Sequence, residues 1–269
     1  MNGLKNVNGE HNFLKSCLCV RINYIYLVFS NPVKSINLNE RIIFALDVPS
    51  PEDAKQWVKK LDGDIKFFKV GLELFLSGGW DIVDFIIDRG NQVMLDLKFF
   101  DIPETVHLAV QQVKGRGVSL MTIHGNDAII RAAVSDKGNV KVLAVTVLTS
   151  FDESDMRQMG LTGAVEDLVL IRAKKAVELG CDGVVSSALE AKPLRDGLGN
   201  DFYIVTPGIR PASATPGDDD QRRIATARNA IISGANHVVV GRPIRTAADP
   251  VGTIKKLQEE IAEGLACCR

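Results

Sequence analysis

The sequence has almost no excess of charge of either sign. Among its 269 residues, 32 Lys and Arg stand against 33 Asp and Glu, which gives a formal net charge of −1. A protein that binds nucleic acid or an anionic membrane needs a basic surface, and this balance offers none. We therefore predict neither a nucleic-acid partner nor a membrane partner.

Cysteine is scarce in the body of the chain. Cys181 lies alone there, and the other four of the five cysteines lie near a terminus, namely Cys17, Cys19, Cys267 and Cys268. No disulfide framework and no zinc-binding spacing can be built from this pattern, which is typical of proteins in a reducing compartment. We predict a cytoplasmic protein that holds no metal ion.

Long hydrophobic runs are also missing. The stretch 17–29 is apolar, but Arg21 and Asn23 interrupt it, and a helix that crosses a bilayer needs about 20 apolar residues. No small-x-small cleavage site follows it. Three interpretations of residues 1–38 stay open: a targeting segment, a disordered extension, or translated upstream sequence from a misplaced start. We favour the last two, because regular periodicity begins only at Arg41, and we assign residues 39–269 to a single domain.

From Arg41 onward, short apolar runs alternate with stretches of helical periodicity. Eight runs are rich in Val, Ile and Leu: 41–47, 65–70, 92–97, 118–124, 140–148, 183–186, 202–206 and 237–241. Continuous apolar runs indicate strands that are covered on both faces, as in a parallel sheet. Helices are expected between them. The range 51–61 has helical apolar spacing after Pro51, and the ranges 164–179 and 224–233 are each followed by a glycine that can end a helix.

The repeated unit predicts the fold class. Eight βα units within about 225 residues are typical of a (β/α)8 TIM barrel of the α/β class, in one domain. A doubly wound open sheet is the alternative. It normally carries a Gly-x-Gly-x-x-Gly turn after an early strand, and this sequence has none.

The ends of the apolar runs are polar. In TIM barrels the active site lies at the carboxyl ends of the strands. Ionisable or polar residues stand there in nearly every unit: Asp47, Lys69, Asp96, Lys98, His124, Thr149, Ser186, Thr206 and Arg242. One such residue could be a solvated loop residue, but the coincidence across the set predicts a site in the barrel mouth.

The densest polar group follows the third run. Asp96 and Lys98 stand two residues apart, so they point to the same side of a strand, and Asp101 comes just beyond. With Asp47 and Lys69 they would form carboxylates and ammonium groups that keep one another charged. A lysine held as a cation is poorly suited to Schiff-base chemistry. It is suited to protonating a carbanion or binding an anion.

Glycine-containing turns follow the last two runs. These are Pro207-Gly208-Ile209-Arg210 and Gly241-Arg242-Pro243, and TIM barrels commonly bind phosphate at this place. Arg242 can hold a phosphate through two N–H donors. The loop 211–220, rich in Pro, Ser, Thr, Gly and Asp, is expected to be a mobile lid. Its Asp run at 218–220 fits a helix cap better than a metal site.

With these residues in view, the sequence resembles the orotidine 5′-phosphate decarboxylases of the bacterial type, from about Arg41 to the C-terminal helix. The motifs that carry the resemblance are Ala45-Leu46-Asp47, Lys69-Val70-Gly71, Leu95 to Phe99 with Asp101 to Thr105, Ala144 to Ser150, Thr206 to Arg210, Asp220 to Arg223, and Gly241 to Pro243. The loop between Arg210 and Gln221 is somewhat longer than the family pattern.

The resemblance implies decarboxylation of orotidine 5′-phosphate to UMP in pyrimidine synthesis, with no cofactor and no metal. Lys98 would protonate C6 of the pyrimidine, and Asp96 would lie near the carboxylate that leaves. Asp47 and Lys69 would complete the charged array and hold the ribose hydroxyls.

The remaining roles implied by the resemblance concern the substrate and the oligomer. In a homodimer, Asp101, as a catalytic residue, and Thr105 would reach the site of the partner subunit. Other substrate-binding positions would be Ile102, Thr149 at the pyrimidine, and Pro207, Arg210, Gln221, Gly241 and Arg242 toward the phosphate.

Two alternatives remain at this stage. A keto-sugar-phosphate decarboxylase or hexulose-phosphate synthase on the same barrel shares the Asp-x-Lys-x-x-Asp motif but needs Mg2+, and its pattern does not account for 148–150 or 206–210. A catalytically silent barrel that only binds nucleotide or phosphate would need no such charged array. We assign no catalytic role to His107 or His124, because histidines on a helix face or at a strand end are more often structural.

Overall fold

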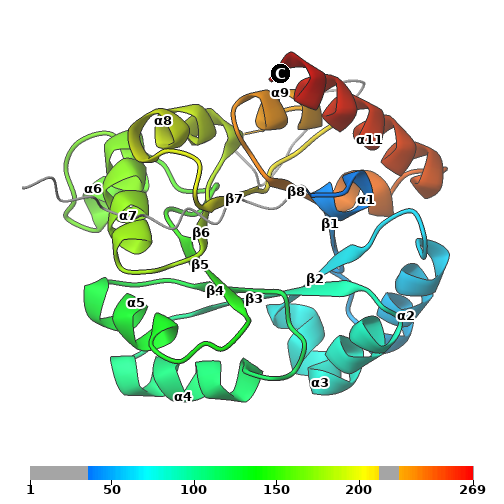
Figure 1. Cartoon of the computed structure of the whole chain (residues 1–269), viewed down its shortest axis with the longest axis horizontal. Coiled ribbons are helices and arrows are strands. Elements are labelled where there is room, and N and C mark those ends of the chain that lie inside the picture. The colour runs from blue at the N-terminus through cyan, green and yellow to red at the C-terminus, as the bar shows by residue number, and fades with distance from the viewer. Residues whose placement is uncertain (1–35, 212–223, 269) are drawn as a thin grey trace, which may run out of the picture. The chain divides into compact units, whose positions relative to one another are not determined.

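The computed structural model describes residues 36–211 and 224–268. They form a closed barrel of eight parallel strands in the order β1 to β8, with helices on its outside (Figure 1). The strands are β1 Ile42–Ala45, β2 Phe67–Gly71, β3 Gln92–Phe99, β4 Leu120–Ile123, β5 Lys141–Val145, β6 Gly183–Val185, β7 Tyr203–Thr206 and β8 His237–Val240. Because β1 also pairs with β8, the sheet has no open edge. The predicted TIM barrel is confirmed, and the doubly wound sheet is excluded.

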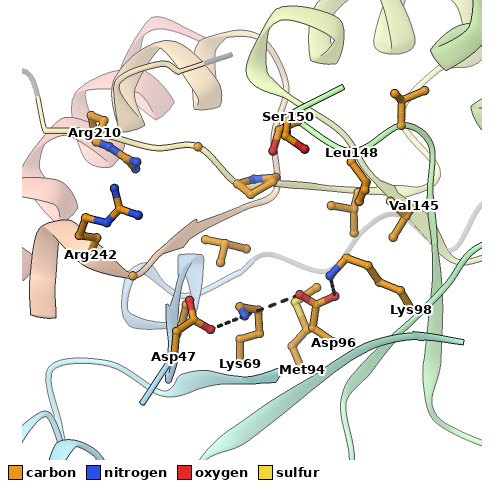
Figure 2. Close-up of a pocket in the computed structure, with 18 of the residues that line it drawn as sticks. Asp47, Lys69, Met94, Asp96, Lys98, Val145, Leu148, Ser150, Arg210 and Arg242 are labelled. Atoms are coloured by element: carbon orange, nitrogen blue, oxygen red, sulfur yellow. Dashed lines mark hydrogen bonds and ion pairs between the residues drawn. The ribbon is translucent and has the colours of Figure 1, made fainter. Parts of the chain in front are cut away.

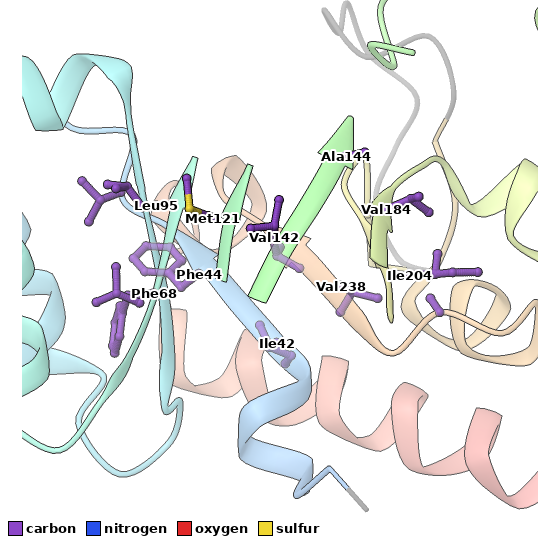
Figure 3. Close-up of a cluster of buried hydrophobic side chains, with 14 of the residues drawn as sticks. Ile42, Phe44, Phe68, Leu95, Met121, Val142, Ala144, Val184, Ile204 and Val238 are labelled. Carbon is purple, nitrogen blue, oxygen red and sulfur yellow. The ribbon is translucent and has the colours of Figure 1, made fainter. Parts of the chain in front are cut away.

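Both faces of the strands are buried, which explains the continuous apolar runs. The inward side chains form one cluster: Ile43, Ala45, Phe67, Met94, Leu120, Leu143, Val205 and Val239. The alternate residues point outward and pack under the helices, among them Phe44, Phe68, Leu95, Met121 and Val238 (Figure 3). The sheet therefore encloses one hydrophobic core, and a second core lies between the sheet and the helices.

Helices follow the strands. Their bounds are α1 Leu38–Arg41, α2 Pro51–Lys60, α3 Leu72–Asp88, α4 Pro103–Val113, α5 Asp127–Val134, α6 Glu153–Gln158, α7 Val165–Glu178, α8 Ala188–Leu198, α9 Ala227–Ile232, α10 Arg242–Arg245 and α11 Pro250–Cys267. Local chemistry sets the start of α2: the Ser50 side chain accepts a hydrogen bond from the Asp53 backbone N–H, and Pro51 occupies the first turn.

Two predicted boundaries differ from the observed ones by three residues. The run 140–148 was expected to be a strand throughout, but β5 ends at Val145, and the following residues turn into a loop whose Thr146 hydroxyl donates to the Val185 carbonyl. The helix expected at 224–233 begins only at Ala227, because Ala225 pairs with Ile209 in an isolated bridge and Thr226 caps the helix.

The N-terminal prediction falls mostly outside the described residues. Of the segment 1–38, the structure describes only the last three residues, and α1 begins at Leu38. The assignment of 1–38 to an extension and of 39–269 to one domain stays a prediction. Within the described part of the chain, no helix is long and apolar enough to cross a membrane.

Candidate active site

A cavity of about 330 Å³ opens at the carboxyl ends of the strands. Nine of the predicted site residues line it (Figure 2): Asp47, Lys69, Asp96, Lys98, Thr149, Pro207, Arg210, Gly241 and Arg242. They come from the ends of five strands, β1, β2, β3, β7 and β8, and from the loop after β5. The closed barrel therefore brings together residues that are far apart in the sequence.

Four charged side chains form an alternating row across the floor of this cavity (Figure 2). The Lys69 Nζ lies 2.9 Å from Oδ1 of Asp47 and 3.7 Å from Oδ2 of Asp96. On the other side of Asp96, Oδ1 lies 2.9 Å from the Nζ of Lys98. Asp96 thus lies between the two ammonium groups, and each of its oxygens faces one of them.

The row keeps Asp96 ionised although its side chain is only 13% exposed. Burial, the largest single effect, raises the pKa of Asp96, but the charges of Lys69 and Lys98 and hydrogen bonds from Lys98 and Thr122 outweigh it, so the pKa lies below its ordinary value. The carboxylate is therefore negative at neutral pH. It gives Lys98 a fixed counterion.

The backbone of Lys98 departs from an ordinary strand. Among the described residues, Lys98 is the single non-glycine residue with a positive φ, at 48°, a conformation that costs an L-residue about 1–2 kcal/mol. Alternation along the strand predicts that Asp96 and Lys98 face the same side, and they do. It does not predict this left-handed turn, which coincides with a register shift between β3 and β4.

The wall beside Lys98 is apolar. Met94, Val145 and Leu148 surround the side of the cavity into which the lysine points (Figure 2), and Thr149, which is buried, follows directly on the loop after β5. An apolar wall reduces screening by water, so the charges of the row act more strongly on a bound molecule.

The opposite end of the cavity is cationic. The guanidinium groups of Arg210 and Arg242 face each other there, away from Lys98 (Figure 2). Gly241 lets the end of β8 approach β1 closely, because a Cβ at this position would lie 3.1 Å from Cβ of Ala45 and 3.4 Å from Oδ2 of Asp47. Two arginines beside closely packed backbone can bind a phosphate through paired N–H donors.

Three predicted site residues lie elsewhere, and a fourth is outside the described residues. Asp101, Ile102 and Thr105 do not line the cavity of their own chain. Asp101 and Ile102 are exposed, and the Asp101 carboxylate accepts a hydrogen bond of 2.6 Å from the Ile102 backbone N–H. Gln221, like the Asp run at 218–220 and all of the predicted lid except Pro211, lies outside the described residues.

Two residues that hydrogen-bond to members of the charged row were missed from the sequence. Arg245 on α10 lines the cavity, and its Nη1 donates to the backbone carbonyl of Asp47. Thr122 on β4 donates to Asp96 and accepts from the Lys98 backbone N–H. A polar residue inside the apolar run 118–124 is the signal that could have identified Thr122; nothing in the local sequence marks Arg245.

The two histidines without an assigned role lie outside the cavity lining. The His124 ring packs against Phe100, with centroids 5.5 Å apart, and burial lowers its pKa, with a smaller effect from Arg172. His107 contacts Ser135 and the Ala132 carbonyl. Within residues 36–211 and 224–268, no three His, Cys, Asp or Glu side chains cluster in a way that could hold a metal ion.

The sequence is similar to those of several bacterial orotidine 5′-phosphate decarboxylases. The chain is 47% identical to the orotidine 5′-phosphate decarboxylase of Methylococcus capsulatus over 234 residues, which is 87% of this chain and 96% of that protein. It is 44% identical to the protein of the same name from Nitrobacter winogradskyi over 228 residues, covering 84% and 94% of the two chains.

Solved structures give the same result. The crystal structure of orotidine 5′-phosphate decarboxylase from Lactobacillus acidophilus is similar with a TM-score of 0.73 and 34% identity, over 82% of this chain and 99% of that chain. The enzyme from Pyrococcus horikoshii aligns with a TM-score of 0.67 and 25% identity over the same shares. Residues 40–257 match the family model as well. The chain belongs to the orotidine 5′-phosphate decarboxylase / HUMPS family.

Proposed function

We propose that the protein decarboxylates orotidine 5′-phosphate to UMP and CO2, the last step of pyrimidine synthesis, and that Lys98 is the proton donor. The observation that carries the proposal is the Nζ of Lys98, which is held 2.9 Å from the Asp96 carboxylate in a cavity whose far end holds two arginines. A nucleotide with its phosphate at the arginines would place its base toward the lysine.

The charged row fits the chemistry of this reaction. When the bond between C6 and the carboxylate carbon breaks, its electron pair stays on C6, where the ring gives little resonance stabilisation. A fixed ammonium group stabilises that charge without reorganisation, and its proton then forms the new C6–H bond. Asp96 would lie beside the departing carboxylate, so that repulsion is relieved as neutral CO2 forms.

The other cavity residues are proposed to bind the substrate. Asp47 and Lys69 would hold the ribose hydroxyls, and Thr149 would contact the pyrimidine. Pro207, Arg210, Gly241 and Arg242, with Gln221, would bind the phosphate. Because the phosphate is remote from the bond that breaks, its binding energy can serve to organise the charged row in the transition state.

We also propose a homodimer whose subunits complete each other's sites. The segment after β3 exposes large apolar side chains, with Phe100 67% and Ile102 66% exposed, and Leu108 on α4 is 53% exposed. Large apolar side chains exposed in one segment are typical of a protein–protein interface. Asp101 and Thr105 lie in the same segment. If a second copy covers this segment, both side chains would reach the site of that second copy.

Mixing two inactive variants tests the shared site. Lys98→Ala and Asp101→Ala each remove one member of every site in their own homodimer. In a mixed dimer, one site would regain Lys98 from one subunit and Asp101 from the other, so refolding the two variants together should restore activity that neither shows alone. No restored activity in mixtures shown by native mass spectrometry to contain the heterodimer would contradict a shared site.

The activity itself is tested by following the ultraviolet absorbance of orotidine 5′-phosphate. We expect the absorbance change of decarboxylation at an equal rate with and without EDTA, because no step of the proposed mechanism uses a metal. Loss of activity in EDTA that Mg2+ restores would favour the metal-dependent sugar-phosphate enzymes instead. The cytoplasmic location stays a prediction, supported by Cys181, which is buried and unpaired.

A further inference from the structure

The register between strands β3 and β4 shifts at the residues of β3 that contribute to the charged row. Leu95 pairs with Met121 and Phe99 pairs with Ile123, so residues 96–98 of β3 stand opposite Thr122 alone. Extra residues in one strand form a bulge, which commonly re-aims side chains beside active sites. The regular ladder of backbone hydrogen bonds is interrupted at this point.

The side chain of Thr122 bridges the interruption. Its Oγ1 lies 3.0 Å from the backbone N of Lys98 and 2.9 Å from Oδ1 of Asp96. The backbone N–H can only donate, so Oγ1 accepts from Lys98, and its own proton is directed to the carboxylate. Thr122 is 1% exposed, and water therefore does not compete for either bond.

Both bonds act on groups of the proposed reaction. The bond from its backbone N–H holds Lys98 in the left-handed conformation, φ 48°. The bond to Oδ1 fixes the rotation of the Asp96 carboxylate, which presents Oδ1 to Lys98 and Oδ2 to Lys69. We propose that Thr122 is a positioning residue that sets the proton donor and its counterion. This inference rests on the proposed function.

A role in filling the barrel interior would need no hydroxyl. Leu120, the residue below Thr122 on the inner face of β4, belongs to the apolar inner cluster. Valine has the shape of threonine and would fill the same space. The hydroxyl instead makes one hydrogen bond as acceptor and one as donor, each to a residue of the charged row. The two roles therefore predict different results for Thr122→Val.

The test compares Thr122→Val with Thr122→Ser, which keeps the hydroxyl. For Thr122→Val we expect kcat to fall about 10–100-fold while KM for orotidine 5′-phosphate changes less than about threefold, because the phosphate end is untouched. Thr122→Ser should stay within about threefold of the wild-type kcat. Thr226→Val is the matched control, since it removes a hydroxyl that accepts a hydrogen bond from a backbone N–H at the start of α9, outside the cavity lining; its kcat should equal that of the wild type.

Three results would overturn the inference: an undiminished kcat in Thr122→Val, an equal loss in Thr122→Ser, or a rise in KM that matches the fall in kcat. Thermal unfolding shows whether each variant is folded. If Thr122→Val is not, Thr122→Ser and Thr122→Ala differ by one oxygen, and the same split in kcat is expected between them. A wild type without decarboxylase activity overturns the proposed function and this inference with it, whereas an active wild type matched by Thr122→Val overturns the inference alone.

Discussion

Asp96 and Lys98 act as one unit. The carboxylate remains charged despite its burial because Lys69 and Lys98 flank it, and Lys98 in turn is held by its 2.9 Å ion pair with Oδ1 of Asp96. Removing either partner therefore changes the other. We expect their effects on kcat not to add, as is usual for residues that work as a unit.

Arg242 tests the phosphate end at the scale of one residue. For Arg242→Ala we expect KM for orotidine 5′-phosphate to rise about 10–100-fold, since hydrogen bonds to charged groups contribute about 1.5–3 kcal/mol. Michaelis–Menten kinetics measure the change. Arg131→Ala on α5, an exposed arginine outside the cavity, is the control and should leave KM unaltered. An Arg242→Ala enzyme with the wild-type KM would remove Arg242 from the phosphate site.

The sequence predicted the convergence of Asp47, Lys69, Asp96 and Lys98, because the carboxyl ends of parallel strands meet at one end of a barrel. It could not predict the left-handed backbone of Lys98 or the bridge from Thr122. Both depend on the register between β3 and β4, which is a property of two strands together. The contact of Arg245 with Asp47 likewise arises only when the barrel closes between β8 and β1.

At the scale of elements, strand prediction succeeded where both faces are buried, and it failed at loop ends. The run 140–148 is apolar except for Lys141 and Thr146, but its last residues line the cavity instead of extending β5. Composition alone does not distinguish a buried strand from an apolar loop that covers a site. The start of α9 was misplaced for a similar reason, because Ala225 is used in a bridge to Ile209.

The packing of α9 against α11 gives a prediction for two glycines. A Cβ at Gly264 of α11 would lie 2.9 Å from the Arg228 carbonyl and 3.1 Å from Cβ of Ile231, whereas one at Gly197 of α8 would meet only Cδ1 of Leu170 at 3.5 Å. Gly264→Ala should lower the free energy of unfolding by about 1–3 kcal/mol through overpacking. Gly197→Ala should raise it by up to about 1 kcal/mol through helix propensity.

Urea unfolding of both variants measures these changes. They replace the same residue type in a helix, so the unfolded chain is affected alike, and the difference reports on packing. Equal free energies of unfolding for Gly264→Ala and Gly197→Ala would contradict the close packing of α9 against α11 at Gly264.

At the scale of the whole molecule, the two ends of the barrel differ in the charge that they hold. The carboxyl ends of the strands hold the charged row. At the other end, His237 is buried: its ring stacks on Tyr203 and meets Phe67 edge-on, and its Nδ1 lies 2.9 Å from the Glu40 carbonyl. Burial above all, with smaller effects of Arg41 and Lys141, lowers the pKa of His237 to about 4.

This histidine predicts loss of stability in mild acid. In the unfolded chain, His237 is protonated once the pH falls below its ordinary pKa of 6.5. In the folded protein, it stays neutral until the pH falls to about 4. The free energy of unfolding should therefore fall between these pH values, by on the order of 3 kcal/mol. Urea unfolding from pH 7 to pH 4 measures the slope. His237→Gln, which cannot titrate, should have a flatter slope, and an unchanged slope would contradict this role.

The central claim is that the Lys98 ammonium group supplies the proton that replaces CO2. Its most direct test is single-turnover decarboxylation of orotidine 5′-phosphate in D2O by the wild type and by Lys98→Ala, with mass spectrometry of the product and titration of each protein with UMP. The account predicts UMP with one deuterium at C6 from the wild type, and from Lys98→Ala a rate lowered by more than about 10³-fold with UMP binding largely retained. Formation of UMP by Lys98→Ala at the wild-type rate would contradict it.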